Sequence, residues 1–176
     1  MDREYIITMT AVNRVGILAA VTKAMAELGG DLREASQTVV RGFFTMIFSS
    51  EFPADLAPDV IIDHLQDACR PFGIEVSLKE VGKQHVDSEE DARLSHFSLR
   101  LGGENQKGVL KELSSAISMR RIDIAGMHAG RTRGGKGFEM VMKIAVPPDF
   151  DMQGFLSHLH ELGRPFNITA DVSDYS

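Results

Sequence analysis

Apolar and polar positions in the first half of the chain predict the order strand, helix, strand, strand, helix, strand. Residues 5–12 alternate between apolar and polar side chains, as a half-buried strand does. Apolar residues then recur three and four positions apart over 18–28, which predicts a helix that ends at the following glycine pair. Residues 31–40 and 43–51 predict two strands joined by a two-residue hairpin turn.

A second helix over residues 59–71 and a strand over 74–81 complete the first half. The same order then returns in the second half. Its predicted strands and helices fall at residues 94–102, 110–117, 122–132, 138–146, 155–162 and 168–173. The repeated order predicts two units of one fold.

Two short motifs recur in the same order in both halves. Asn-x-x-Gly-(Ile or Val)-Leu occurs at 13–18 and 105–110, and Arg-Pro-Phe-x-Ile occurs at 70–74 and 164–168. Such self-similarity indicates an internal duplication. Residues 83–93 are polar and acidic and bury little surface, so they are predicted to be a linker between a domain at 1–82 and a domain at 94–176.

The order β-α-β-β-α-β is that of the ferredoxin-like fold. The expected class is therefore α+β, with two tandem four-stranded antiparallel sheets, each carrying its helices on one face. The third strand is apolar on both sides, with Phe43 and Ile47 alternating with Phe44, Met46 and Phe48. We expect the second face there to be covered by the other half or by another subunit.

Composition and charge narrow the class of protein. The chain has 176 residues, 43% of them hydrophobic, and a formal net charge of −6. A single cysteine, a charged start of the sequence and the lack of any long apolar run favour a soluble protein of the cytoplasm. No contact with membrane is expected.

Charge is distributed unevenly between the halves. Residues 1–82 carry seven Lys and Arg against twelve Asp and Glu, whereas residues 94–176 carry ten against nine. The acidic first half argues against direct nucleic-acid binding. The basic, glycine-rich stretch 131–137 is interpreted as a solvated loop, with contact to an acidic partner or a phosphate as the alternative.

The turn at 13–18 is the main candidate for chemistry. Its glycine, Gly16, stands where a strand passes into a helix. The free N–H groups of a helix N-terminus attract a carboxylate or another anion. Asn13 is able to hold an ammonium or a carboxylate group, but a helix cap explains it equally well, and Gly16 is equally explained by its backbone conformation alone.

The motif Asn13-Arg14-Val15-Gly16-Ile17-Leu18, at the end of a first strand in this fold order, resembles the signature of ACT domains. Two such units in a chain of this length resemble the glycine cleavage system transcriptional repressor family. The resemblance implies sensing of a small molecule, most often an amino acid, at a domain interface. It places one ligand site at Asn13, Arg14, Val15, Gly16, Ile17 and Leu18, and a second, less well preserved one at Asn105, Gln106, Lys107, Gly108, Val109 and Leu110.

The sequence gives weaker evidence for metal binding, RNA binding or catalysis. The six histidines lack metal-ligand spacing and are interpreted as surface residues, and Cys69 as a small buried apolar residue. An RNA-recognition motif shares this topology, but it needs aromatic residues on its third strand. An acylphosphatase-like hydrolase also shares it, and Asn13 and Arg14 supply the residue types it needs.

The sequence thus predicts a non-catalytic regulatory protein without metal or cofactor. It is expected to bind an amino acid at an ACT domain interface, to form homo-oligomers, and to signal to a protein partner. A transcription factor acting in the control of amino-acid metabolism is one such partner, with no direct contact to nucleic acid. The alternatives are an interaction module without a ligand and the acylphosphatase-like hydrolase.

Overall fold

The computed structural model describes residues 2–82, 93–104, 108–132 and 134–175. The chain forms two compact units, residues 1–86 and 87–176, and each is described by itself. Residues 83–92 of the predicted linker lie outside the described ranges, so its exact bounds stay a prediction.

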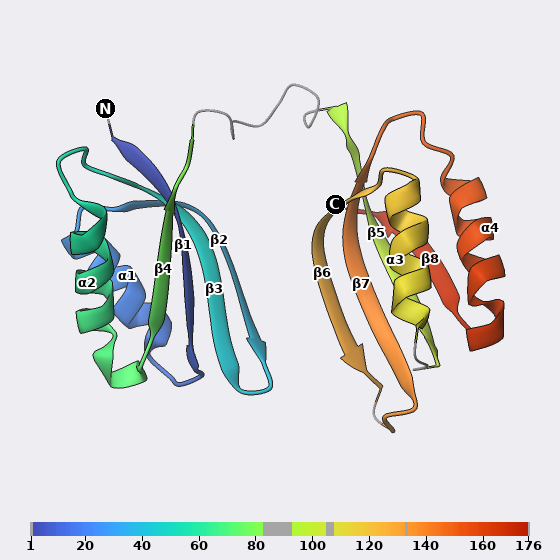
Figure 1. Ribbon diagram of the computed structural model, residues 1–176, viewed down its shortest axis with the longest axis horizontal. Helices are drawn as coiled ribbons and strands as arrows, with labels where there is room; N and C mark the ends of the chain where they lie inside the picture. The colour runs from blue at the N-terminus through green and yellow to red at the C-terminus, as the bar shows by residue number, and fades with distance from the viewer. Residues whose placement is uncertain (1, 83–92, 105–107, 133, 176) are drawn as a thin grey trace. The chain divides into compact units, whose positions relative to one another are not determined.

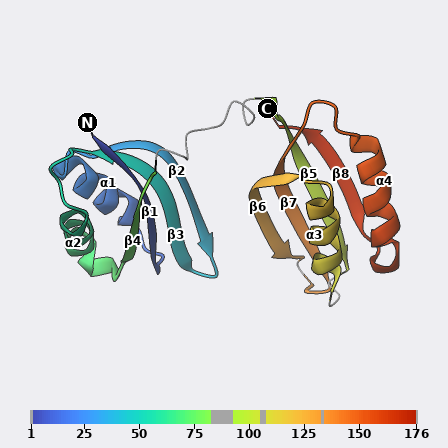
Figure 2. The same cartoon turned by 45° about the horizontal axis from the view of Figure 1, so that its top comes forward.

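The first unit has the predicted order of elements. They are β1 (Arg3–Val12), α1 (Ile17–Glu27), β2 (Asp31–Val40), β3 (Phe43–Phe52), α2 (Pro58–Ala68), the 3-10 turn η1 (Arg70–Phe72) and β4 (Glu75–Glu80). The four strands pair in the order β2-β3-β1-β4, and every pair is antiparallel. Both helices lie on one face of this sheet (Figures 1 and 2).

The second unit repeats this arrangement. Its elements are β5 (Ser95–Glu104), α3 (Val109–Met119), β6 (Asp123–Arg131), β7 (Gly137–Val146), α4 (Met152–Gly163), η3 (Arg164–Phe166) and β8 (Thr169–Asp174). The strand order β6-β7-β5-β8 is the counterpart of that in the first unit. The structure therefore confirms two ferredoxin-like units with antiparallel sheets.

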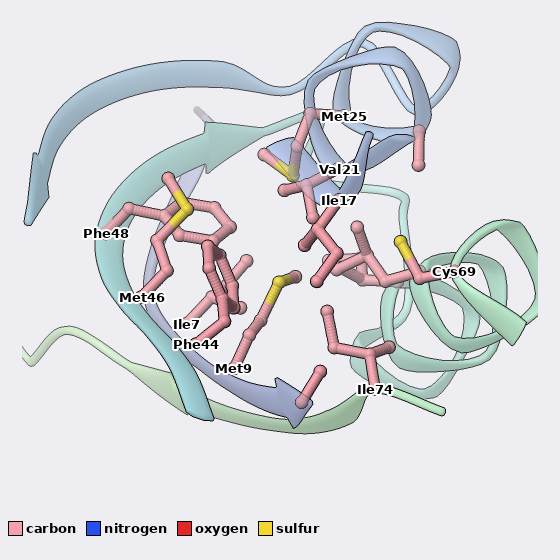
Figure 3. Packing of buried hydrophobic residues seen from close by; sticks show 14 of the residues in the cluster. Ile7, Met9, Ile17, Val21, Met25, Phe44, Met46, Phe48, Cys69 and Ile74 are labelled. Carbon is pink, nitrogen blue, oxygen red and sulfur yellow. The ribbon is translucent and has the colours of Figure 1, made fainter. Parts of the chain in front are cut away.

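Each unit has its own hydrophobic core. In the first, alternate residues of β1 and β3 face the helices, so that Ile7 lies opposite Phe48 and Met9 opposite Met46. Figure 3 shows these side chains together with Ile17 of α1. The core of the second unit includes none of these residues, because it is built from β5, β7, β8, α3 and α4.

Cys69 belongs to the first core, as the sequence predicted. Its side chain is fully buried next to the end of α2, and Figure 3 shows it on the same side of the buried cluster as Ile74. Burial raises the pKa of the Cys69 thiol, because the charged thiolate loses its hydration. This environment suits a structural apolar residue and not a nucleophile.

Predicted bounds differ from the structure by one to three residues at several elements, and two of these differences lie next to prolines. Helix α2 ends at Ala68 instead of continuing to Pro71, because proline has no N–H and its ring collides with the carbonyl of the preceding turn. Strand β3 continues through Phe52, which pairs with Arg3, and it is Pro53 that ends the strand.

The sheet face opposite the helices remains exposed in the first unit. Phe44, Met46 and Phe48 are buried, whereas Phe43 is 59% and Ile47 46% exposed. Phe43 also lies between Val12 and Val40 in the strand register, and both neighbours are exposed. These three side chains form an apolar row on this face, and the predicted cover over it stays a prediction.

The hydroxyl of Tyr5 gives a test of this core. It is buried and has no hydrogen-bond partner among the residues that the structure describes. A buried unsatisfied polar group costs about 1–3 kcal/mol. We expect Tyr5→Phe to raise the free energy of unfolding of the first unit by about 1 kcal/mol. Urea unfolding followed by circular dichroism measures this, with the exposed Tyr175→Phe as the control. An unchanged or lower stability of Tyr5→Phe would contradict the assignment.

Candidate functional site

The turn that joins β1 to α1 depends on a glycine. Gly16 is the N-cap residue of α1, with φ 99° and ψ −11°. Residues with a side chain rarely adopt this region of conformational space, so glycine is the residue that the bend favours. The conformational interpretation of Gly16 is thus correct, and a functional role for the turn needs further observations.

The first N–H groups of α1 have no hydrogen-bond partner among the residues that the structure describes. The N–H of Ala20 donates to the carbonyl of Gly16 at 3.0 Å, which is the first hydrogen bond of the helix. Among the described residues no side chain caps the helix, and its first turn contains no acidic residue. The N–H groups of Ile17, Leu18 and Ala19 therefore point out of the helix end, where the helix dipole favours an anion. Asn13 is not the helix cap, so that alternative is wrong.

Three contacts from distant parts of the unit hold the turn in place. The N–H of Asn13 donates to the carbonyl of Gly42 in the β2–β3 hairpin at 2.8 Å. The guanidinium of Arg14 donates to the carbonyl of Pro71 at 3.4 Å. A side-chain carbon at Gly16 would start 3.5 Å from the ring of Phe72, so this ring lies directly behind the turn. The backbone of the turn is thus supported before any ligand arrives.

The hairpin that contacts Asn13 is itself a tight turn. Arg41 and Gly42 both have positive φ angles, 51° and 85°, as a type I′ turn requires. This confirms the two-residue loop predicted from the sequence. The carbonyl of Gly42 is therefore presented by a short, well-defined turn.

The side chains of the turn differ in exposure. Asn13, Arg14 and Val15 are exposed, and Leu18 is half exposed. Ile17 is buried in the core. A ligand on this surface can therefore meet four of the predicted side chains, but only the backbone N–H of Ile17. Chemically, the arrangement offers hydrogen-bond donors and a positive charge for a carboxylate, beside apolar surface.

The second turn repeats the geometry of the first where it is described. Gly108 has φ 92° and ψ −17° and caps α3, and the N–H of Glu112 donates to its carbonyl at 3.1 Å. Val109 is buried and Leu110 is exposed, like Ile17 and Leu18. The predicted site residues Asn105, Gln106 and Lys107 lie outside the described residues.

Two differences separate the turns. Within the described part of the chain, nothing lies within 4 Å of a side-chain carbon placed at Gly108, so no counterpart of the Phe72 support is found. The first turn of α3 also contains Glu112, whose negative charge opposes an anion at that helix end. Both differences make the first turn the better anion site.

The sequence did not predict the residues that support the first turn. Gly42, Pro71 and Phe72 are far from it along the chain. Pro71 and Phe72 belong to the Arg-Pro-Phe motif that recurs in both halves. That recurrence was a usable signal, although nothing in the motif itself indicates which turn it contacts.

The histidines and other possible metal ligands do not form a site in the described ranges. There, no three His, Cys, Asp or Glu side chains are grouped as a metal site would need. His64 instead bridges to Glu27 at 2.9 Å, linking α2 to α1. Helices of the length and apolarity that a membrane crossing demands are not found in the described part of the chain.

Comparison with known sequences points to one family. A sequence model of the ACT domain matches residues 5–60, which include the first turn. A UPF0237 protein of Methanosarcina acetivorans is 36% identical over 84 residues, which are 47% of this chain and 86% of the relative. A UPF0237 protein of Methanosarcina mazei is 34% identical over 85 residues, 48% of this chain and 87% of the relative.

Solved structures share the fold over the whole chain. An unknown protein from Galdieria sulphuraria has a TM-score of 0.81 at 17% identity, with all of both chains covered. A candidate glycine cleavage system transcriptional repressor has a TM-score of 0.69 at 11% identity, with 99% of both chains covered. At these identities the likeness establishes the fold and its tandem repetition. The chain belongs to the family of the UPF0237 proteins, and its residues 5–60 match the ACT-domain model.

Proposed function

We propose that the chain is a non-catalytic regulatory protein that binds an amino acid at the turn Asn13–Leu18. The observation that carries this proposal is the N-terminus of α1, where three N–H groups have neither a side-chain cap nor another partner in the described part of the chain, and where the first turn contains no acidic residue. Such a helix end is suited to a carboxylate. The contacts of Gly42, Pro71 and Phe72 hold it in the required geometry.

The proposed contacts use each part of an amino acid. The carboxylate accepts hydrogen bonds from the N–H groups of Ile17 and Leu18, with the positive charge of Arg14 nearby. The side-chain oxygen of Asn13 accepts from the ammonium group. Val15 and Leu18 offer apolar surface to the remainder of the ligand.

The turn lies on the surface of its unit, so a second wall is needed to enclose a ligand. We propose that a second ACT unit, of this chain or of another copy, supplies that wall. A ligand bound between two units favours the arrangement for which it has the higher affinity. A protein partner then senses the arrangement, and the name of one structural neighbour suggests transcriptional control as the setting.

An amino-acid screen by thermal shift tests this function. A ligand at about 100 times its Kd stabilises the folded state by about 2.7 kcal/mol. We expect at least one of the twenty amino acids to raise the Tm, and Asn13→Ala to reduce the response at equal concentration. Asn105→Ala changes the residue that corresponds to Asn13 in the second copy of the motif, so it tests the second turn alone. If Asn13→Ala shows the same rise in Tm as the unchanged chain, the ligand does not bind at this turn.

A second candidate is an interaction module without a ligand. The exposed apolar row of Val12, Phe43 and Val40 favours it, because such surface is often an interface. No shift with any amino acid, together with a stable oligomer, supports this alternative. Turnover of acyl phosphates that is lost in Arg14→Ala would instead support the hydrolase.

A further inference from the structure

We propose that the cleft between the end of α4 and the start of β8 is a binding site for a small zwitterion, a molecule with one ammonium and one acid group. The cleft lies in the second unit and uses no residue of the turn Asn13–Leu18. This inference therefore goes beyond the proposed function, and the two fail separately.

The cleft is formed where two elements of the second unit lie side by side. Figures 1 and 2 show α4 next to β8, and the 3-10 turn η3 joins them. The cleft has a volume of about 470 Å³, within the range of about 300–1,000 Å³ that is usual for small-molecule sites. Its lining residues are His160, Glu161, Arg164, Asn167, Ile168 and Thr169. Ile168 is buried and supplies apolar surface, whereas the other five side chains are polar and exposed.

Two opposite charges in the lining are available to a ligand. Arg164 and Glu161 have no ion pair among the described residues, although they stand three positions apart. An acid group alone is disfavoured, because Glu161 repels it and the end of α4 carries the negative pole of the helix dipole. A cation alone is repelled by Arg164. A zwitterion satisfies both residues, with its acid group on Arg164 and its ammonium at Glu161 and the helix end.

The uncharged side chains of the cleft offer acceptors and one more donor. Nε2 of His160 accepts from a backbone N–H of β8 at 3.4 Å, so the neutral ring carries its proton on Nδ1 and is able to donate there. The hydroxyl of Thr169 donates to the carbonyl of Gly102 at 3.3 Å, and its lone pairs stay available. Nδ2 of Asn167 donates to Glu104 at 2.6 Å, which leaves Oδ1 as an acceptor. These hydrogen bonds restrain the side chains before a ligand arrives.

The first unit contains the same elements but a different set of charges. By the recurring Arg-Pro-Phe motif, Arg70 and Asp67 correspond to the two charged residues of the cleft. Arg70 and Asp67 form an ion pair with each other, so neither charge is left for a ligand. At the start of the following strand, β4, Glu75 adds a further negative charge. The first unit therefore supplies a matched control for the second.

A nuclear magnetic resonance titration of the full chain tests the proposal. The probes are β-alanine and O-phosphoethanolamine, which have the same two-carbon spacer between the ammonium and a carboxylate or a phosphate. At least one of them is expected to shift the backbone amides of Asn167, Thr169 and Ala170 saturably, and its identity shows which acid group the cleft binds. Propionate and ethylamine, which lack the ammonium or the acid group, are expected to bind at least about tenfold more weakly.

Matched variants locate the bound zwitterion. Arg164→Gln and Glu161→Gln each remove one charge and are expected to weaken binding at least about tenfold. Both side chains are exposed, so these variants are expected to fold normally. Arg70→Gln, the corresponding change in the first unit, is expected to leave the affinity unchanged. Asn13→Ala is also expected to bind the probe normally, so loss of the cleft and loss of the ligand turn are distinguishable.

Three results would overturn the proposal. The first is that neither zwitterion shifts the amides of Asn167, Thr169 and Ala170 saturably. The second is an affinity for propionate or ethylamine equal to that for the zwitterions, because one charge would then suffice. The third is an unchanged affinity in Arg164→Gln or in Glu161→Gln, because the bound molecule would then not contact both charges.

Discussion

Phe155→Ala is expected to lower the free energy of unfolding of the second unit by about 3–5 kcal/mol, the range for truncation of a buried phenylalanine. The Phe155 side chain is fully buried in α4. Its ring packs edge-to-face on Phe150 at 5.7 Å, and the guanidinium of Arg120 lies over it at 5.6 Å. The variant loses apolar burial, an aromatic pair and a cation–π contact together. For a domain of this size, such a loss is a large part of the total stability.

Because the two cores share no residue, the effect should be confined to the second unit. Residue-resolved amide hydrogen exchange measures this, with faster exchange expected in α4 and β8 and unchanged exchange in β1 and β3. Met119→Ala, at a position 84% exposed in the same unit, is the control and should change little. Equal loss of protection in both units would show that they unfold together.

Gly16→Ala is expected both to destabilise the first unit and to remove the response to ligand. At φ 99° a side chain is strained, and residues held in such conformations cost about 1–3 kcal/mol. The added carbon meets the Phe72 ring at 3.5 Å, an ordinary contact, so the cost comes from the backbone. Relief of this strain changes the turn and moves the N–H groups of α1 out of position.

Gly108→Ala is the matched control for this variant. Gly108 has nearly the same conformation, with φ 92°, so a similar loss of stability is expected in the second unit. Thermal unfolding with and without the amino acid found in the screen compares the two variants. If the turn at 13–18 is the main site, Gly108→Ala keeps most of the ligand response. Equal loss of response in both variants would indicate a general effect of instability.

Most of the fold was predictable from periodicity. Strand β2 was predicted over the same residues that the structure gives, because Gly29-Gly30 before it and the Arg41-Gly42 turn after it mark its two ends. The end of α2 at Ala68 was missed because the apolar pattern continues past this residue, whereas Pro71 prevents the backbone from continuing the helix. Periodicity reports where apolar side chains recur, but not where proline interrupts the hydrogen bonding.

The site was only partly predictable. The bend at Gly16 followed from its place between a strand and a helix, a local property. The contacts of Asn13 with Gly42 and of Arg14 with Pro71 join residues far apart in sequence, and no short motif encodes such pairs. An apolar groove between α3 and β6, lined by Leu110, Ile117 and Met127 among others, was not predicted either. It depends on the space between α3 and the edge strand, which arises only when the unit is folded.

The central claim is that an amino acid binds at the N-terminus of α1, and a nuclear magnetic resonance titration of the full chain tests it most directly. With the amino acid found by thermal shift, we predict the largest amide shifts at Asn13–Ala19, with smaller shifts or none at Val109 and Leu110. Shifts confined to the second unit, or no shifts with any of the twenty amino acids, would contradict the claim.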